Sequence, residues 1–232
     1  MKSFRTKKWL KGLMLAMLLI VGSTVFSASA KEVQAATAGF KTIDGKTYYI
    51  KSDGSKQKGW LTLGGYKYYF NTKTGVQVKG WMKVNGKYTY YFTKGKGVMA
   101  TGWMTSSKGK KRYFAKNGVM ATGWMTDSKG HKRYFNPKTG KLTTGWVNCS
   151  KGRKRYFTKG GGIMATGWLT NSKGQKRYFY KTSGYMATKR VKNKSKNISY
   201  YFATSTGYMY TGLKTIDQKN YYFKSNGVMA VS

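Results

Sequence analysis

Acidic side chains are almost absent from this chain of 232 residues, which has 5 Asp and Glu against 45 Lys and Arg and a formal net charge of +40. It has one histidine, His131, and one cysteine, Cys149. Acid–base catalysis, nucleophilic catalysis and metal binding depend on these residue types, so the composition predicts no enzyme, no metal site and no cofactor. A single cysteine also excludes a disulfide within the chain.

Aromatic residues are abundant instead: 7 Trp, 20 Tyr and 11 Phe make up 16% of the sequence, beside 30 Gly. Disordered basic segments lack this much apolar surface, so the chain is expected to fold. One proline and the lack of a three-residue glycine period exclude proline-rich and collagen-like chains.

The first 35 residues have the pattern of a secretory signal peptide. Basic residues at positions 2–11 precede an apolar run at 13–26, and small-residue motifs then place cleavage after residue 30 or 35. The run is shorter than the ~20 apolar residues that a membrane-spanning helix needs. We predict a signal peptide at 1–35 and a secreted domain at 36–232 that has no membrane contact after cleavage. An uncleaved N-terminal anchor is the alternative.

Three residue columns recur along the rest of the chain. The first is Gly-Trp, the second is Tyr-Tyr-Phe or Arg-Tyr-Phe, and the third is a glycine followed two residues later by Met or Leu, as in Gly118 and Met120. About nine repeats of 20–23 residues follow, starting near residues 39, 59, 80, 102, 123, 145, 167, 189 and 212. Phe40, Arg190 and Leu213 replace the tryptophan in the outer repeats, as capping repeats would.

Each repeat predicts a β-hairpin. In the fourth, short strands are expected at 103–105 and 111–114, joined by Ser-Lys-Gly-Lys. An isolated hairpin is marginal in water, and a unit of this length cannot bury its own core, so neighbouring units must stack. The predicted fold is all-β: an elongated solenoid or superhelix of stacked β-hairpins, with the three columns as its spine. Like residues one repeat apart are expected to line up along it.

Gly-Trp, Tyr-Tyr-Phe and Gly-x-Met-x-Thr-Gly at this period resemble the bacterial cell-wall-binding repeats. That superfamily includes choline-binding modules, the glucan-binding repeats of glucosyltransferases and the repeats of glucosylating toxins. The resemblance covers residues 39–232 and implies a hairpin superhelix with ligand sites between consecutive repeats. In choline-binding modules, the site is an aromatic cage made by the Gly-Trp tryptophan, a second Trp just before Tyr-Tyr and an aromatic residue of the next repeat.

This chain departs from that cage at two positions. The residue before the Tyr pair is never aromatic, being Thr47, Lys67, Thr89, Lys111, Lys132, Lys154, Lys176, Ser199 or Asn220. Four central repeats also replace the first Tyr by Arg112, Arg133, Arg155 and Arg177. Fixed positive charges repel a quaternary ammonium ion, so choline is a doubtful ligand, above all in the central repeats. The combinations of Trp60 with Tyr68 and Tyr69, and of Trp81 with Tyr90 and Tyr91, depart least from the cage.

Two sets of residues are candidate ligand sites. The aromatic set, suited to stacking on saccharide, is Trp60, Tyr69, Trp81, Tyr91, Trp103, Tyr113, Trp124, Tyr134, Trp146, Tyr156, Trp168 and Tyr178. The basic set, suited to an anionic polymer, is Lys108, Lys111, Arg112, Lys129, Lys132, Arg133, Lys151, Lys154, Arg155, Lys173, Lys176 and Arg177. Packing between hairpins is the competing role for the aromatic set, and the two roles can coexist.

A solvated face is the competing role for the basic set. Residues 102–188 hold 19 Lys and Arg but only one acid, Asp127. Mixed charges would serve solubility better and repel one another less, so this imbalance favours an anionic partner. Asp127, His131 and Cys149 fall at variable turn positions, where we predict no catalytic role.

The sequence therefore predicts a secreted, non-enzymatic protein of the cell wall or cell surface. Its predicted ligand is a wall or surface polysaccharide, with teichoic acid among the candidates, because linked weak sites suit a periodic polymer. The alternative is a secreted binder of nucleic acid or another anionic matrix polymer, since interleaved Tyr and Lys or Arg can stack on bases and contact phosphates.

Overall fold

The computed structural model describes residues 37–230, so the predicted signal peptide lies outside the described residues. Within them, eighteen strands form nine antiparallel hairpins, and one 3-10 turn, η1 (Ser150–Gly152), is present. The first three hairpins are β1 (Gly39–Ile43) with β2 (Lys46–Ile50), β3 (Gly59–Leu63) with β4 (Tyr66–Phe70), and β5 (Gly80–Val84) with β6 (Tyr88–Phe92). The next three are β7 (Gly102–Thr105) with β8 (Lys111–Phe114), β9 (Gly123–Thr126) with β10 (Lys132–Phe135), and β11 (Gly145–Asn148) with β12 (Lys154–Phe157). The last three are β13 (Gly167–Thr170) with β14 (Lys176–Phe179), β15 (Lys189–Asn193) with β16 (Ile198–Phe202), and β17 (Gly212–Ile216) with β18 (Lys219–Phe223).

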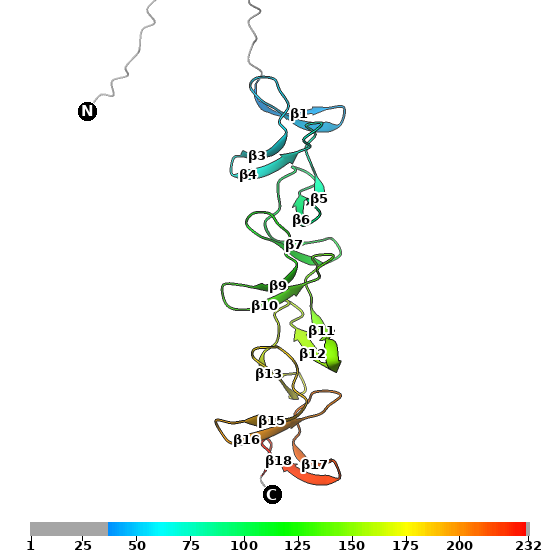
Figure 1. The fold of residues 1–232 in the computed structure, drawn as a ribbon, viewed down its shortest axis with the longest axis vertical. Helices are drawn as coiled ribbons and strands as arrows, with labels where there is room; N and C mark the ends of the chain where they lie inside the picture. The colour runs from blue at the N-terminus through cyan, green and yellow to red at the C-terminus, as the bar shows by residue number, and fades with distance from the viewer. Residues whose placement is uncertain (1–36, 231–232) are drawn as a thin grey trace, which may run out of the picture.

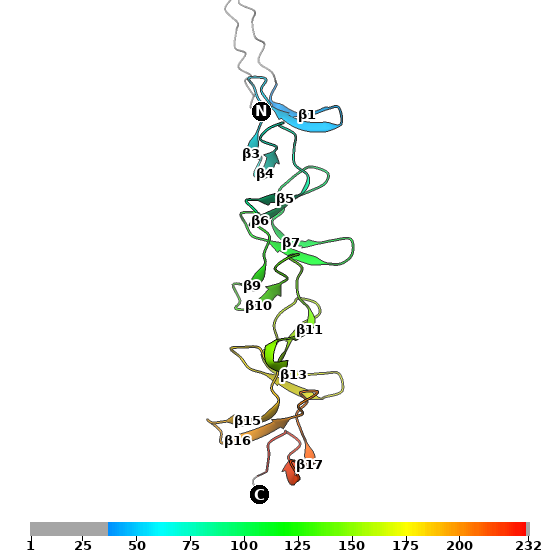
Figure 2. The same cartoon turned by 45° about the vertical axis from the view of Figure 1, so that its right-hand side comes forward.

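The hairpins stack one on another into a rod (Figure 1). Every third hairpin points to the same side: β3, β9 and β15 extend to the left in Figure 1, and β1, β7 and β13 to the right in Figure 2. The predicted all-β hairpin solenoid is therefore confirmed. The expected alignment of like residues one repeat apart is wrong, because these residues wind around the rod and return to the same side after three repeats. No helix in residues 37–230 is long and apolar enough to cross a membrane.

Each hairpin has two faces, because side chains alternate along a strand. In β7 and β8, Trp103 pairs with Tyr113 on one face, and Phe114 lies on the other. The Trp face of each hairpin packs on the Phe face of the next one, so that the ring centroid of Trp103 lies 5.9 Å from that of Phe135. The core is a line of buried phenylalanines, namely Phe70, Phe92, Phe114, Phe135, Phe157, Phe179, Phe202 and Phe223.

The segments between hairpins tie neighbouring repeats together through the backbone. After β8, Met120 forms an isolated bridge with Phe114 of its own repeat, and its N–H donates to the carbonyl of Thr89 in the preceding repeat at 2.8 Å. The same hydrogen bond to the preceding repeat is made by Gln77, Met99, Leu142, Met164, Met186, Met209 and Met229. The third sequence column is therefore part of the spine, as predicted.

This third column also packs against itself from repeat to repeat, because its glycine lies against the column side chain of the preceding repeat, as Gly140 does against Met120. Gly140 has a φ of +62°, and a Cβ atom there would lie 2.4 Å from the Sδ of Met120. Gly140→Ala is expected to lower the free energy of unfolding by about 2–4 kcal/mol, because it adds left-handed backbone strain and displaces a buried side chain.

Gly130→Ala is the matched control for this prediction. Gly130 lies at the tip of the same repeat with a φ of +78°, but a Cβ there would meet nothing within 4 Å. Only the backbone strain, about 1–2 kcal/mol, is then expected. Urea denaturation followed by circular dichroism measures both variants, and equal losses would show that the Met120 contact contributes nothing.

Candidate functional site

The contact between the Trp face of one hairpin and the Phe face of the next is called a junction here. At the junction between the second and third repeats, the Trp60 ring lies 5.0 Å from Tyr69 of its own hairpin, 5.4 Å from Tyr90 and 6.0 Å from Phe92 of the next (centroid distances). Trp60, Tyr69 and Tyr90 thus form three aromatic walls. Equivalent sets are Phe40 with Tyr49 and Tyr68, and Trp168 with Tyr178 and Tyr200. These three are the aromatic junctions.

Two expected groupings are right for the second tyrosine of each pair and wrong for the first. Tyr68 does not lie with Trp60 but 5.1 Å from Phe40 of the preceding hairpin, because it points to the face opposite Trp60. Tyr90 likewise belongs with Trp60 and not with Trp81. The first residue of each Tyr pair therefore completes the junction of the preceding repeat.

At the four central junctions an arginine takes the place of that tyrosine. The guanidinium Cζ lies 5.0–5.7 Å from the centroid of the preceding tryptophan ring. These pairs are Arg112 on Trp81, Arg133 on Trp103, Arg155 on Trp124 and Arg177 on Trp146. They are called the arginine junctions. Guanidinium groups pack well on aromatic faces through cation–π attraction, so the tryptophan holds each arginine in place.

Each of these arginines also reaches the following repeat. The Nε–H groups of Arg112, Arg133, Arg155 and Arg177 donate to the carbonyls of Thr139, Gly161, Ser183 and Thr206 at 2.8–2.9 Å. Arg155 and Arg177 are covered from a second side by Tyr185 and Tyr208, whose ring centroids lie 4.0 Å and 3.6 Å from Cζ. The arginines are thus half-buried clamps between three successive repeats rather than free surface charges.

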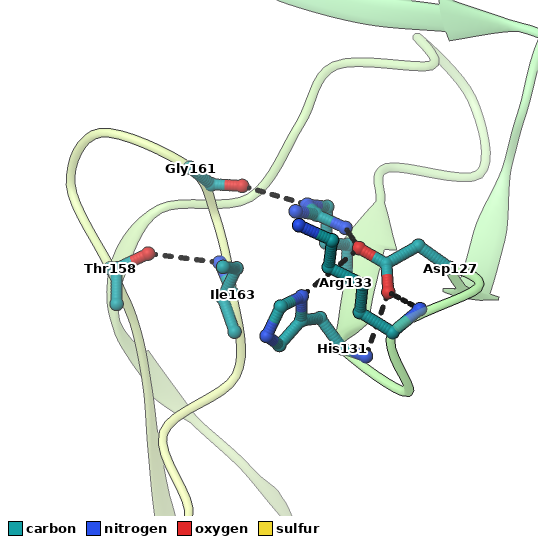
Figure 3. A network of polar contacts seen from close by, with 7 residues as sticks. Asp127, His131, Arg133, Thr158, Gly161 and Ile163 are labelled. Atoms are coloured by element: carbon teal, nitrogen blue, oxygen red, sulfur yellow. Dashed lines mark hydrogen bonds and ion pairs between the residues drawn. The ribbon is translucent and has the colours of Figure 1, made fainter.

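Asp127 is close to one of these arginines (Figure 3). Its Oδ2 accepts a hydrogen bond from Arg133 Nη1 at 2.6 Å and lies 3.2 Å from His131 Nδ1, and its Oδ1 accepts the backbone N–H groups of Lys129 and His131. The Arg133 guanidinium, above all, holds the pKa of Asp127 well below its usual range. Asp127 and His131 therefore close a hairpin turn, and the Asp127 carboxylate neutralises one arginine.

The structure separates the predicted basic set into three locations. Lys108, Lys129, Lys151 and Lys173 lie exposed at hairpin tips. Lys111, Lys132, Lys154 and Lys176 lie on the Trp faces, at or near the surface, where Lys111 Nζ donates to the Gly160 carbonyl at 3.1 Å. The four arginines lie in the junctions. Tip lysines and junction arginines do not form one surface.

The lysines of the Trp faces and the arginines do line shared grooves. One groove of about 320 Å³ is lined by Trp103, Lys111 and Arg133, and one of about 360 Å³ by Trp124, Lys132 and Arg155. A third, of about 550 Å³, is lined by Trp81, Arg112, Thr89, Lys138 and Lys141.

The tryptophans are partly open to solvent, although they also pack on the phenylalanines. Trp60, Trp81, Trp103, Trp124, Trp146 and Trp168 are 45–50% exposed, and the paired second tyrosines are half-buried. Both roles considered for the aromatic set, packing and an accessible ring, are thus available to the same side chains.

Sequence reasoning missed several residues of these sites. Tyr200 closes a cavity of about 760 Å³ that is also lined by Trp168, Tyr178 and Tyr180. Lys138 and Lys141 belong to the third groove. Tyr90 and Tyr200 are the first tyrosines of their pairs, so the repeat pattern does mark them. They are found only if each first tyrosine is matched with the tryptophan of the preceding repeat. Tyr180, Lys138 and Lys141 fall outside the repeated columns, so no periodic signal marks them.

Comparison with known proteins agrees with this geometry. A family model described as a choline-binding repeat matches residues 37–72, 58–102 and 100–145, and one described as a putative cell wall binding repeat matches residues 211–229. Together they match more than half of the chain. A search of curated protein sequences gave no significant match.

Several solved structures share the fold. Choline-binding protein F of Streptococcus pneumoniae is 28% identical with a TM-score of 0.66, over 80% of this chain and 61% of its own length. CbpJ of the same species is 27% identical with a TM-score of 0.56, over 84% of this chain and 81% of its own. The choline-binding domain of CbpL, also from that species, is 24% identical with a TM-score of 0.52, over 85% and 99%, and supports the fold alone. This chain spans about three fifths of the length of choline-binding protein F. With its repeat register, its stacked hairpins and these matches, the chain belongs to the cell-wall-binding repeat proteins, which include the choline-binding repeats.

Proposed function

We propose that this chain is a secreted, non-catalytic protein that binds cell-wall or surface polysaccharide, including teichoic acid, through its junctions. The observation that carries the proposal is the repeated groove in which a half-exposed tryptophan lies beside lysine and arginine. An indole face can stack on the C–H face of a sugar, while the cations attract phosphate or carboxylate groups on the same polymer.

Many weak sites on one rod suit a long polymer with repeated groups. Once one groove has bound, the next group is held at a high effective concentration, so overall affinity exceeds that of a single groove without any new contact. Successive hairpins point in different directions around the rod (Figures 1 and 2), and the grooves lie between them, which favours a flexible polymer that can follow the turns. Membership of the cell-wall-binding repeats supports location at the cell wall or surface.

Choline itself is disfavoured as the ligand by the charges in the grooves. The cage of choline-binding modules needs an aromatic wall where this chain has Lys67, Lys111, Lys132, Lys154 or Lys176, and a second where it has the four junction arginines. An ammonium and a guanidinium beside the tryptophan oppose a cation. Although choline-binding proteins are among its structural relatives, an anionic polymer suits the central junctions better.

The test is retention of residues 36–232 on purified peptidoglycan, with and without teichoic acid, across a series of salt concentrations. We expect retention that rises with teichoic acid, falls with salt because cations meet phosphates, and is reduced several-fold by Trp124→Ala. Thermal unfolding of the variant checks that the rod remains folded. No retention on any wall fraction would refute the proposal. A preference for naked DNA over every wall fraction would favour the nucleic-acid alternative.

A further inference from the structure

We propose that the four arginine junctions bind the anionic oxygens of a polymer. A choline cage accepts a cation, whereas these junctions would accept an anion. This inference rests on the proposed function and names the chemistry of the ligand at its central sites. In each of these junctions, the guanidinium lies against the tryptophan face, so the site holds a cation of its own. A second cation would be repelled there, whereas an oxyanion would be attracted.

The guanidinium groups are positioned before any ligand arrives. The tryptophan fixes one face, and the Nε–H bond to a carbonyl of the following repeat, 2.8–2.9 Å long, fixes the rotation of the group. Nε is thereby occupied, and the Nη atoms remain as donors, although Nη1 of Arg133 already donates to Asp127 and Nη1 of Arg155 to Cys149. Preorganised donors lose little rotamer entropy on binding, which favours even a small anionic group.

The Nη groups of two arginines have no acceptor among the described residues. Arg112 and Arg177 are hydrogen-bonded only through Nε, yet no buried side-chain nitrogen or oxygen within residues 37–230 lacks a partner. Their Nη atoms must therefore reach solvent at the junction surface. These are the atoms available to an incoming oxygen, and charge-assisted bonds from guanidinium to phosphate or carboxylate are the strong ones.

A lysine supplies the second positive charge of the site. Lys111 and Arg133 line one groove, and Lys132 and Arg155 the equivalent groove one repeat later. At the Arg112 junction the corresponding strand residue is Thr89, but Lys138 and Lys141 line that groove instead. The cation pair is thus retained although the lysine comes from a different segment. Like charges in one groove repel each other, and a bound oxyanion relieves that repulsion.

The four junctions are not equivalent, because only one contains an acid. Asp127 pairs with Arg133, whereas the residues at the same place in the other repeats are Ser106, Cys149 and Asn171. Cys149 Sγ lies 3.4 Å from Arg155 Nη1, so this side-chain position does face the guanidinium. Asp127 already supplies the oxyanion at its junction, and we therefore assign the weakest binding of an external anion to Arg133.

The experiment is NMR of the arginine Nε–Hε groups in residues 36–232, titrated at constant ionic strength. The probes are a glycerol phosphate trimer, trigalacturonate and tetramethylammonium chloride. We expect the signals of Arg112, Arg155 and Arg177 to shift and saturate with an anionic probe, the Arg133 signal to shift least, and the ammonium salt to shift none. The phosphate and carboxylate probes distinguish the two sources of anionic oxygen. Saturable shifts with neither of them would overturn the inference.

Three variants keep the test independent of folding defects. Arg155→Tyr installs the residue that the chain itself has at Tyr90 and Tyr200, so the junction should persist while anion binding there is lost. Tyr90→Arg, beside Trp60 and Lys67, should create a new anion site. Asp127→Asn should strengthen binding at Arg133 by a few fold. Unchanged probe affinity in all three variants would contradict the assignment.

The proposed function and this inference can fail separately. If the chain is retained on cell walls while the arginine signals ignore both anionic probes, the inference is wrong and the proposed function stands. If the signals respond but no wall fraction retains the chain, the anion sites stand and the wall ligand is wrong.

Discussion

Tetramethylammonium is expected to bind the double variant Lys132→Trp, Arg155→Tyr at least 100-fold more tightly than it binds the natural chain. Trp124 already provides one aromatic wall at this junction, and it is 50% exposed. A tryptophan at 132 would supply the second wall on the same strand face, since residues 132 and 134 point the same way and Tyr134 pairs with Trp124. A tyrosine at 155 would supply the third.

The expected gain in affinity for tetramethylammonium has two sources in the same groove, namely the removal of repulsion and the addition of attraction. Two cations leave the groove, and two further rings then face the ligand, each worth about 0.5–2 kcal/mol for a cation over an aromatic face. A gain of about 3 kcal/mol corresponds to roughly 100-fold in the dissociation constant. The arrangement of the third wall has precedents in this chain, because Tyr90 lies 5.4 Å from Trp60 and Tyr200 lies 5.1 Å from Trp168.

Isothermal titration calorimetry with tetramethylammonium chloride measures the change, and the two single variants are its controls. Each single variant keeps one cation in the groove, so each should gain much less than the double variant. A double variant that binds no more tightly than the natural chain, while remaining folded, would mean that the charges at 132 and 155 do not decide which ion the junction accepts.

The repeat register made the fold predictable. Because every copy carries an aromatic pair and a glycine turn at fixed offsets, and all but the first two add a Met or Leu, the hairpins and the buried line of Phe114, Phe135 and their equivalents follow from local patterns. The strands expected at 103–105 and 111–114 are observed as β7 and β8, one residue longer at the start of β7.

The content of the junctions was not predictable from those local patterns. A junction joins residues of two repeats and borrows a carbonyl from a third, as Arg112 does with Trp81 and Thr139. Alternation along the strand places Lys111 and Arg112 on opposite faces, but it does not say which repeat each face meets. The packing sends Arg112 toward the preceding repeat and Lys111 toward the following one. The rotation of successive hairpins likewise depends on packing and not on any single repeat.

Loss of a core phenylalanine is expected to destabilise several repeats when it lies in the middle of the rod, but only one hairpin when it lies at the end. Phe157 is 2% exposed and lies against Trp124 of the preceding hairpin, 6.0 Å between ring centroids. Phe157→Ala should cost about 3–5 kcal/mol, the usual loss for a buried aromatic ring. Phe157→Ile is the control, because Ile50 holds this place in the first repeat, and it should cost clearly less.

Phe223→Ala removes an equally buried ring from the final described hairpin. The centroid of this ring lies 5.9 Å from that of Tyr210, which precedes the hairpin. In a stack whose repeats contact mainly their neighbours, a defect in the middle weakens the coupling of both halves, whereas a defect at the end releases one hairpin. Hydrogen exchange should therefore show lost protection in β17 and β18 alone for Phe223→Ala, and in several repeats around β12 for Phe157→Ala. Equal loss of protection along the whole rod in both variants would show instead that all nine hairpins unfold as one cooperative unit, because coupling across the junctions would then exceed the stability of any single repeat.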